Sequence, residues 1–138
     1  MNGRRVLVDT GAWLAAFHRR DQYHNAAAQA LRRLRTEGVR LVVTDLIVCE
    51  LHLHLVFALG PVMAASHVRT IIDDPSVEQV FCDAVLQAAA FKEWIDRFSD
   101  QAFSLTDAVS FAVMRSMGIS EAFAFDHHFR IAGFETVM

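Results

Sequence analysis

Residues 5–9 read RVLVD and residues 122–126 read AFAFD, so two short apolar runs each end on an aspartate. Short apolar runs of this kind are typical of strands that are buried on both faces of a parallel sheet. In such sheets, ligands bind beyond the carboxyl ends of the strands. We therefore expect Asp9 and Asp126 at the functional edge of one sheet.

The rest of the chain alternates between strand-like and helix-like segments. Further strands are expected at residues 39–43, 77–81 and 134–137. Helices are expected at residues 11–17, from Asp21 to about Gly38, from the cap Thr44 to about Leu59, from Pro61 to the DDP at 73–75, and at 83–98 and 104–117, with a helical turn at 126–131. This alternation predicts an α/β fold with a central, mostly parallel sheet of four to five strands and helices on both faces.

Composition indicates one folded domain. The chain has 138 residues, 54% of them hydrophobic, and no Pro/Gly-rich linker divides it, so residues 1–138 are expected to form a single domain. The first apolar stretch stops at Asp9, too early for a signal peptide, and no run is long enough for a membrane span. A soluble, cytoplasmic protein is expected. Cys49 and Cys82 lie among apolar neighbours and are expected to be buried thiols.

The charge balance neither requires nor excludes a nucleic acid partner. The net charge is −3, whereas RNA-binding domains usually carry a basic excess. Lys92 is the only lysine, and arginine suits phosphate geometry better, although a codon-usage habit would explain the same bias. Seven arginines fall in the first quarter of the chain: Arg4, Arg5, Arg19, Arg20, Arg32, Arg33 and Arg35.

Glu50 interrupts an apolar helix face. The positions that share its face are Leu46, Ile47, Leu53, His54 and Phe57. An unpaired carboxylate buried there would cost several kcal/mol, so Glu50 needs a cation, a proton or a solvent-filled cleft. The alternative is an acid that pairs with an arginine.

Asp107 shares a helix face with Phe111 and Met114 and is expected to point inward. It could instead complete a capping box with Ser104. Asp9 and Asp126 could likewise be helix N-caps, although Thr10 could serve the first helix equally well. Asp100 is left open between an exposed loop acid and a group that supports the site from outside.

Four carboxylates at one sheet edge would repel one another and raise one another's pKa unless a cation neutralises them. Oxygen ligands favour Mg²⁺ or Mn²⁺. Such an ion can polarise a phosphoryl oxygen and activate water. The histidines do not point to zinc, because His52 and His54 are two residues apart on a helix and no third ligand is evident. His127 and His128 are expected to be exposed loop histidines, and His24 a structural one.

Together, VLVDTGAWLAAF at 6–17, Glu50 in VTDLIVCEL, FSLTDAVSFAVMRSMGI at 103–119 and AFAFDHHFRIAGF at 122–134 resemble the PIN-domain family over essentially the whole chain. The resemblance is strongest to the VapC-type toxins of bacterial toxin–antitoxin pairs. It implies a three-layer α/β/α domain and Mg²⁺- or Mn²⁺-dependent endonucleolytic cleavage of RNA. Asp9 and Asp107 would be the central metal ligands, and Glu50 and Asp126 would complete the pocket.

The resemblance also implies partners, namely a homodimer and a cognate antitoxin that inserts a peptide near the acidic pocket. One departure is visible, because many family members have Ser or Thr shortly before the fourth acid, where this chain has Ala124 and Phe125. A non-catalytic PIN-like module that binds RNA or protein is the alternative function.

Two other classes of protein, a phosphatase and a phosphate-accepting receiver domain, fit the sequence less well than a PIN domain. A haloacid dehalogenase-type phosphatase needs a second aspartate two residues after the first, where this chain has Gly11. A receiver domain needs a lysine near its end, whereas Lys92 lies in an expected mid-chain helix.

Overall fold

Among residues 3–137, the sheet predicted from the apolar runs is present and has five strands, all of them parallel. The computed structural model describes residues 3–137. The strands are β1 (Arg5–Val8), β2 (Arg40–Thr44), β3 (Val77–Val80), β4 (Glu121–Phe123) and β5 (Glu135–Thr136), in the order β3-β2-β1-β4-β5. β1 is central, with Leu7 paired to Val42 on one side and Ala122 on the other.

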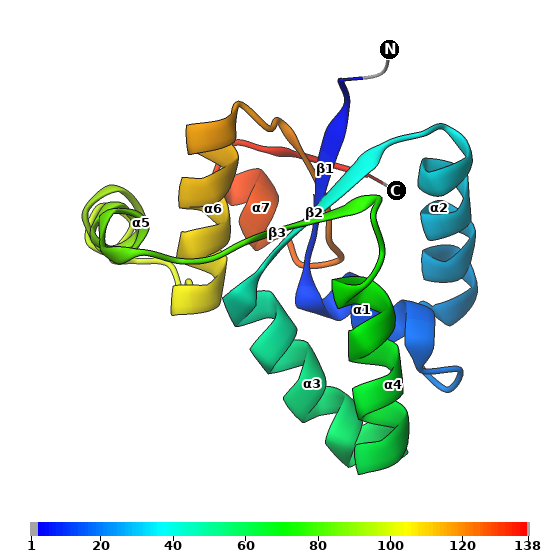
Figure 1. The fold of residues 1–138 in the computed structure, drawn as a ribbon. Coiled ribbons are helices and arrows are strands. Elements are labelled where there is room, and N and C mark those ends of the chain that lie inside the picture. Colours follow the sequence, from blue (N-terminus) through cyan, green and yellow to red (C-terminus); the bar gives the residue numbers. More distant parts are fainter. Residues whose placement is uncertain (1–2, 138) are drawn as a thin grey trace.

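Helices cover both faces of this sheet (Figure 1). They are α1 (Thr10–Phe17), α2 (His24–Thr36), α3 (Asp45–Leu59), α4 (Pro61–Ile72), α5 (Ala84–Ala90), the π-helix η1 (Phe91–Ile95), α6 (Leu105–Met117) and α7 (His128–Ile131). Figure 1 shows α5, α6 and α7 on one side of the strands and α1 and α2 on the other. α3 and α4 pack against each other and extend beyond the carboxyl ends of the strands.

Local signals in the sequence fix the ends of α3 and α6. The buried Thr44 hydroxyl accepts the backbone N–H of Ile47 at 3.1 Å and caps α3. Ser104 and Asp107 form a reciprocal capping box at the start of α6. Gly118 ends α6 with φ +68°, a conformation that residues with a Cβ rarely adopt. The caps at Thr44 and Ser104 fix where α3 and α6 begin at the carboxyl edge of the sheet, whereas Gly118 turns the chain into β4 at the opposite edge.

Two helix predictions need correction. α2 begins at His24 rather than at Asp21, because the Asp21 carboxylate accepts the N–H of Tyr23 at 2.8 Å and closes a turn there. The single helix expected at 83–98 is α5 followed by the π-helix η1. In η1, the buried Trp94 stacks against Phe98.

The prediction of two buried thiols was wrong. Cys49 is exposed and Cys82 is half-buried, and both are free thiols. Cys49 lies on the side of α3 away from the residues that face the core, Ile47, Leu51 and Leu55. Among residues 3–137, no helix combines the length and the hydropathy that crossing a bilayer requires.

Candidate active site

A cleft of about 340 Å³ lies at the carboxyl edge of the sheet, and all four predicted acids line it. Asp9 reaches it from the end of β1, Glu50 from α3, Asp107 from the first turn of α6, and Asp126 from the loop after β4. The remaining lining residues are Thr10, Gly11, Leu14, His54, Ser104 and Phe125. Four segments that are far apart in the sequence therefore meet at one surface.

Asp9 is the most deeply buried of these acids, with 8% of its surface exposed. It occupies the N-cap position of α1, yet its side chain makes no capping hydrogen bond, so the helix does not account for the carboxylate. Burial first, and then the negative charge of Asp107, raise its pKa from 3.8 to about 7. The charges of Glu50 and Asp126 act in the same direction, and the backbone amide of Thr10 opposes them.

Glu50 is half-buried and faces the cleft from α3. The apolar face predicted around it enters the core only in part, because Ile47 is buried whereas Leu53 is 55% exposed and Phe57 83% exposed. α3 extends beyond the sheet, so only one side of its first half can pack on the strands. The alternative of an arginine partner is also unsupported, since within residues 3–137 no cationic side chain forms an ion pair with Glu50 or Asp9.

Asp107 takes part in two arrangements at once. Its Oδ2 accepts the backbone N–H of Ser104 at 3.3 Å, which is the capping box considered as an alternative to a site role. The same oxygen lies 3.2 Å from Nδ1 of His128, and only 13% of the side chain is exposed. Burial raises the pKa of Asp107, whereas the contacts with Ser104 and His128 lower it in part. The cap therefore orients a carboxylate that also faces the cleft.

His128 is the residue that the sequence reasoning missed. It was expected to be an exposed loop histidine, but its side chain is 17% exposed, whereas that of His127 is 71% exposed. Oδ1 of Asp126 accepts the backbone N–H of His128 at 2.9 Å, which turns the loop back on itself. Nδ1 of His128 then lies 3.3 Å from Oδ2 of Asp126, between that carboxylate and Asp107. The Asp126–His128 turn was the only local signal that could have indicated this placement.

Asp100, His24 and Phe125 lie in three different surroundings. Asp100 is exposed and does not line the cleft. The structural role expected for His24 is present, since its Nδ1 lies 2.8 Å from the backbone oxygen of Ala15 and joins α2 to α1. At the position where many family members have Ser or Thr, Phe125 lines the cleft and stacks on Tyr23, with ring centroids 4.5 Å apart.

The donor set suits a hard divalent ion. Asp9, Glu50, Asp107 and Asp126 supply oxygen atoms only, and a cation bound among them would oppose the burial and the neighbouring charges that raise the pKa of Asp9. At the rim, a carboxylate oxygen of Asp126 and ring nitrogens of His127 and His128 lie within 4.8 Å of one another, so nitrogen donors are also within reach.

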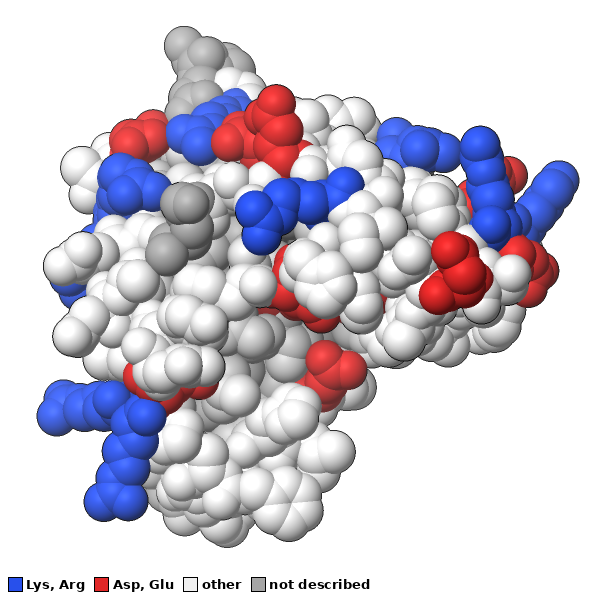
Figure 2. Space-filling model, turned by 180° about the vertical axis from the view of Figure 1, so that it is seen from behind, with Lys and Arg blue, Asp and Glu red and all other residues white. Residues whose placement is uncertain are grey.

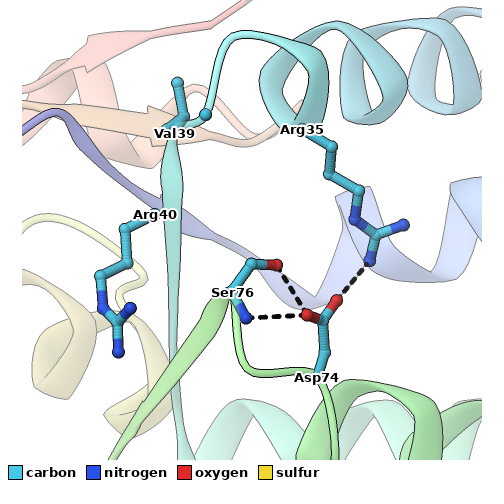
Figure 3. A pocket seen from close by; sticks show the side chains of 6 residues that line it. Arg35, Val39, Arg40, Asp74 and Ser76 are labelled. Atoms are coloured by element: carbon cyan, nitrogen blue, oxygen red, sulfur yellow. Dashed lines mark hydrogen bonds and ion pairs between the residues drawn. The ribbon is translucent and has the colours of Figure 1, made fainter. Parts of the chain in front are cut away.

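A second cavity, of about 430 Å³, lies at the opposite edge of the sheet (Figure 3). Its charged groups are already paired. Arg35 donates to Asp74 at 3.2 Å, Ser76 holds the same carboxylate through its backbone N–H and hydroxyl, and Arg40 pairs with Glu78. These pairs connect α2, β2 and the start of β3, so this cavity has a structural explanation.

The fold and the acidic cleft define a nuclease-like class of protein, and the chain belongs to the PIN-domain family, whose model matches residues 6–135. Its relatives include the 23S rRNA-specific endonuclease VapC20 of Mycobacterium tuberculosis. That protein is 34% identical over 137 residues, a match covering 96% of this chain and 97% of the relative.

Solved structures agree with this assignment. The crystal structure of VapC20, described as a Sarcin–Ricin loop cleaving toxin, matches with a TM-score of 0.82 and 32% identity over 94% of this chain and 95% of that chain. VapBC2 from Rickettsia felis, bound to a DNA fragment from its promoter, matches with a TM-score of 0.72 and 8% identity over 96% of this chain and 97% of that chain. At 8% identity the second match supports the fold alone.

Proposed function

We propose that this protein is a Mg²⁺- or Mn²⁺-dependent endoribonuclease, the toxin of a toxin–antitoxin pair, acting in the cytoplasm as one domain over residues 1–138. The observation that carries the proposal is the meeting of Asp9, Glu50, Asp107 and Asp126 at one cleft, with the pKa of Asp9 raised to about 7. Similarity to the 23S rRNA-specific endonuclease VapC20 supports RNA as the substrate.

In this proposal, Asp9 and Asp107 are the central metal ligands, and Glu50 and Asp126 complete the set. When bound, the ion would polarise a phosphoryl oxygen and lower the pKa of a water molecule. The protein's own contribution is to hold the carboxylates in place. The N-terminal turn of α6 orients Asp107, and His128 holds Asp107 and Asp126 together.

Cleavage can be tested on total RNA with Mg²⁺ or Mn²⁺ titrated from zero. Fragments of 23S rRNA are the first products to look for. Asp9→Asn should abolish metal-dependent cleavage. Asp100→Asn is the matched control, because it removes the same charge from an exposed position outside the cleft and should cleave like the wild type. Undiminished cleavage by Asp9→Asn would refute the assignment, and RNA binding without metal-dependent cleavage would favour the non-catalytic alternative.

Exposed apolar side chains support the proposed protein partners. Phe57 and Val62, at the adjoining ends of α3 and α4, are 83% and 81% exposed. Phe81, shortly before α5, and Val85, in its first turn, are 65% and 76% exposed. We propose that a second copy and an antitoxin cover such surfaces. Sedimentation of the isolated chain, and of the chain co-expressed with the product of the neighbouring reading frame, tests both. A monomer in both preparations would contradict both.

A further inference from the structure

A third cavity, a cleft of about 650 Å³, lies at the C-terminal ends of α1 and α3, two of the helices that line the acidic cleft. It is bounded by the end of α1 and the loop after it, the end of α3, and one face of α4. Its lining residues are Phe17, His18, Arg19, Arg20, Ala58, Leu59, Met63 and His67. We call it the basic cleft. Nothing in the proposed metal chemistry uses these residues.

The basic cleft has the chemistry expected of a nucleic acid site. Arg19 and Arg20 are exposed, and within the described part of the chain neither forms an ion pair, unlike Arg35 and Arg40 at the other sheet edge. The lining contains no carboxylate. Asp21 follows directly in the sequence, where its Oδ1 accepts the N–H of Tyr23, and it does not line the cleft. Seen from behind, basic side chains project from the lower left corner, where the loop after α1 lies (Figures 1 and 2).

An aromatic pair completes the cleft wall. The rings of Phe17 and His67 stack with centroids 4.4 Å apart and an interplanar angle of 25°. Phe17 also stacks on the buried Trp13, at 6.0 Å and 11°, which fixes the pair to the core. A rigid ring surface beside unpaired arginines is the combination by which proteins hold single-stranded nucleic acid, with bases stacked on rings and phosphates paired with arginines.

The two clefts follow one another along α1 and α3. Leu14 lines the acidic cleft and Phe17 the basic cleft, one turn further along α1, while on α3 the order is Glu50, His54 and then Ala58. Eight residues of helix separate Glu50 from Ala58, which is about 12 Å along the axis. An RNA strand whose scissile phosphate lies at the acidic cleft would therefore reach the basic cleft within a few nucleotides. The basic charge there offsets the repulsion that the acidic cleft exerts on RNA.

We propose that the basic cleft binds the RNA strand to one side of the scissile phosphate, with Arg19 and Arg20 pairing with phosphates and the Phe17–His67 pair supporting a base. This inference rests on the proposed ribonuclease function and adds the residues that position its substrate. An acidic peptide from a protein partner is the competing occupant. RNA is favoured because the ring surface, the unpaired arginines and the alignment with the acidic cleft occur together.

Binding can be measured separately from cleavage. A labelled single-stranded RNA of mixed sequence is titrated in EDTA with the Asp9→Asn protein, with and without Arg19→Ala/Arg20→Ala. The double substitution should weaken binding about tenfold at low salt and reduce the slope of log K against log salt by about 1.4, or about 0.7 per lost phosphate contact. Arg32→Ala/Arg97→Ala is the matched control, because both arginines are exposed, form no ion pair among residues 3–137 and line neither cleft.

Further variants distinguish a site from a general charge effect. His67→Ala should weaken binding at least about fivefold, and His67→Phe should restore it, because a ring is retained. In the cleavage-competent protein, Arg19→Ala/Arg20→Ala should raise KM and leave kcat close to that of the wild type.

The outcomes separate the two proposals. If the wild type cleaves RNA but Arg19→Ala/Arg20→Ala binds and cleaves like the arginine control, the basic cleft proposal fails and the nuclease proposal stands. If the double variant loses only its affinity for the neighbouring gene product, the cleft serves a protein partner and the RNA proposal is overturned. If no variant cleaves RNA under any metal condition, the proposed function itself fails.

Discussion

Replacing Asp9 with asparagine should make the metal-free protein more stable at neutral pH, although it removes the most deeply buried acid of the cleft. The pKa of Asp9 is raised from 3.8 to about 7, first by burial and then by Asp107. Between these values the folded protein holds a proton that the unfolded chain has released, so the free energy of unfolding falls as pH rises. A difference of about 3 pKa units, at about 1.4 kcal/mol each, corresponds to about 4 kcal/mol at pH 8. Asparagine cannot ionise and escapes this cost.

The assay is urea denaturation in EDTA at pH 4.5, 6 and 8. Asp9→Asn should be close to the wild type at pH 4.5 and more stable by up to about 4 kcal/mol at pH 8, with the difference growing through the window. Asp100→Asn removes an exposed carboxylate outside the cleft and should show no such pH-dependent gain. A stability difference between Asp9→Asn and the wild type that stays constant from pH 4.5 to 8, or a loss at pH 8, would refute the electrostatic account of the cleft.

Three more predictions concern the metal, the histidine and the helix cap. Mn²⁺ at about a hundred times its Kd should stabilise the wild type by about 2.7 kcal/mol but not Asp9→Asn, and unchanged melting curves would contradict a metal site there. His128→Ala removes a contact that lowers the pKa of Asp107, so protons should compete better with Mn²⁺ for that carboxylate. Mn²⁺ affinity, measured by calorimetry, should fall about 10–100-fold. Equal affinity would show that His128 does not support the site. Thr44→Ala should cost about 1–2 kcal/mol in urea denaturation through loss of the buried cap on α3, and Thr44→Ser should restore most of it.

Much of the fold could be predicted because its signals are local. The apolar run at 5–8 has the length and composition of a buried strand, and β1 has those bounds. Thr44 was expected to cap a helix and does so, and the capping box of Ser104, considered as an alternative, is also present, because a capping hydrogen bond spans only three residues. Among the boundaries that differ from the prediction, α2 begins after the turn that Asp21 closes, a π-helix follows α5 within 83–98, and β4 ends at Phe123.

The site, like the fold, was predictable where its signals are local in the sequence and unpredictable where they are not. Asp9 and Asp126 follow strands of one parallel sheet, so their shared edge follows from strand direction alone. Whether Glu50 faced the core or the cleft depended on how far α3 extends past the sheet, which no local pattern records. The contact of His128 with Asp107 joins residues 21 positions apart, and it was visible only in three dimensions.

The sequence by itself determined the class of fold, the edge of the sheet that carries the chemistry and the four acids that could serve it, because these depend on hydrophobic period and strand direction. Only the tertiary structure decided how deeply each acid is buried and that His128 contacts two of them. It also decided that Arg19, Arg20 and the Phe17–His67 pair line a neighbouring cleft. Burial and pairing depend on which distant segments pack together, and the free energy of a charge depends on that packing more than on its neighbours in the chain.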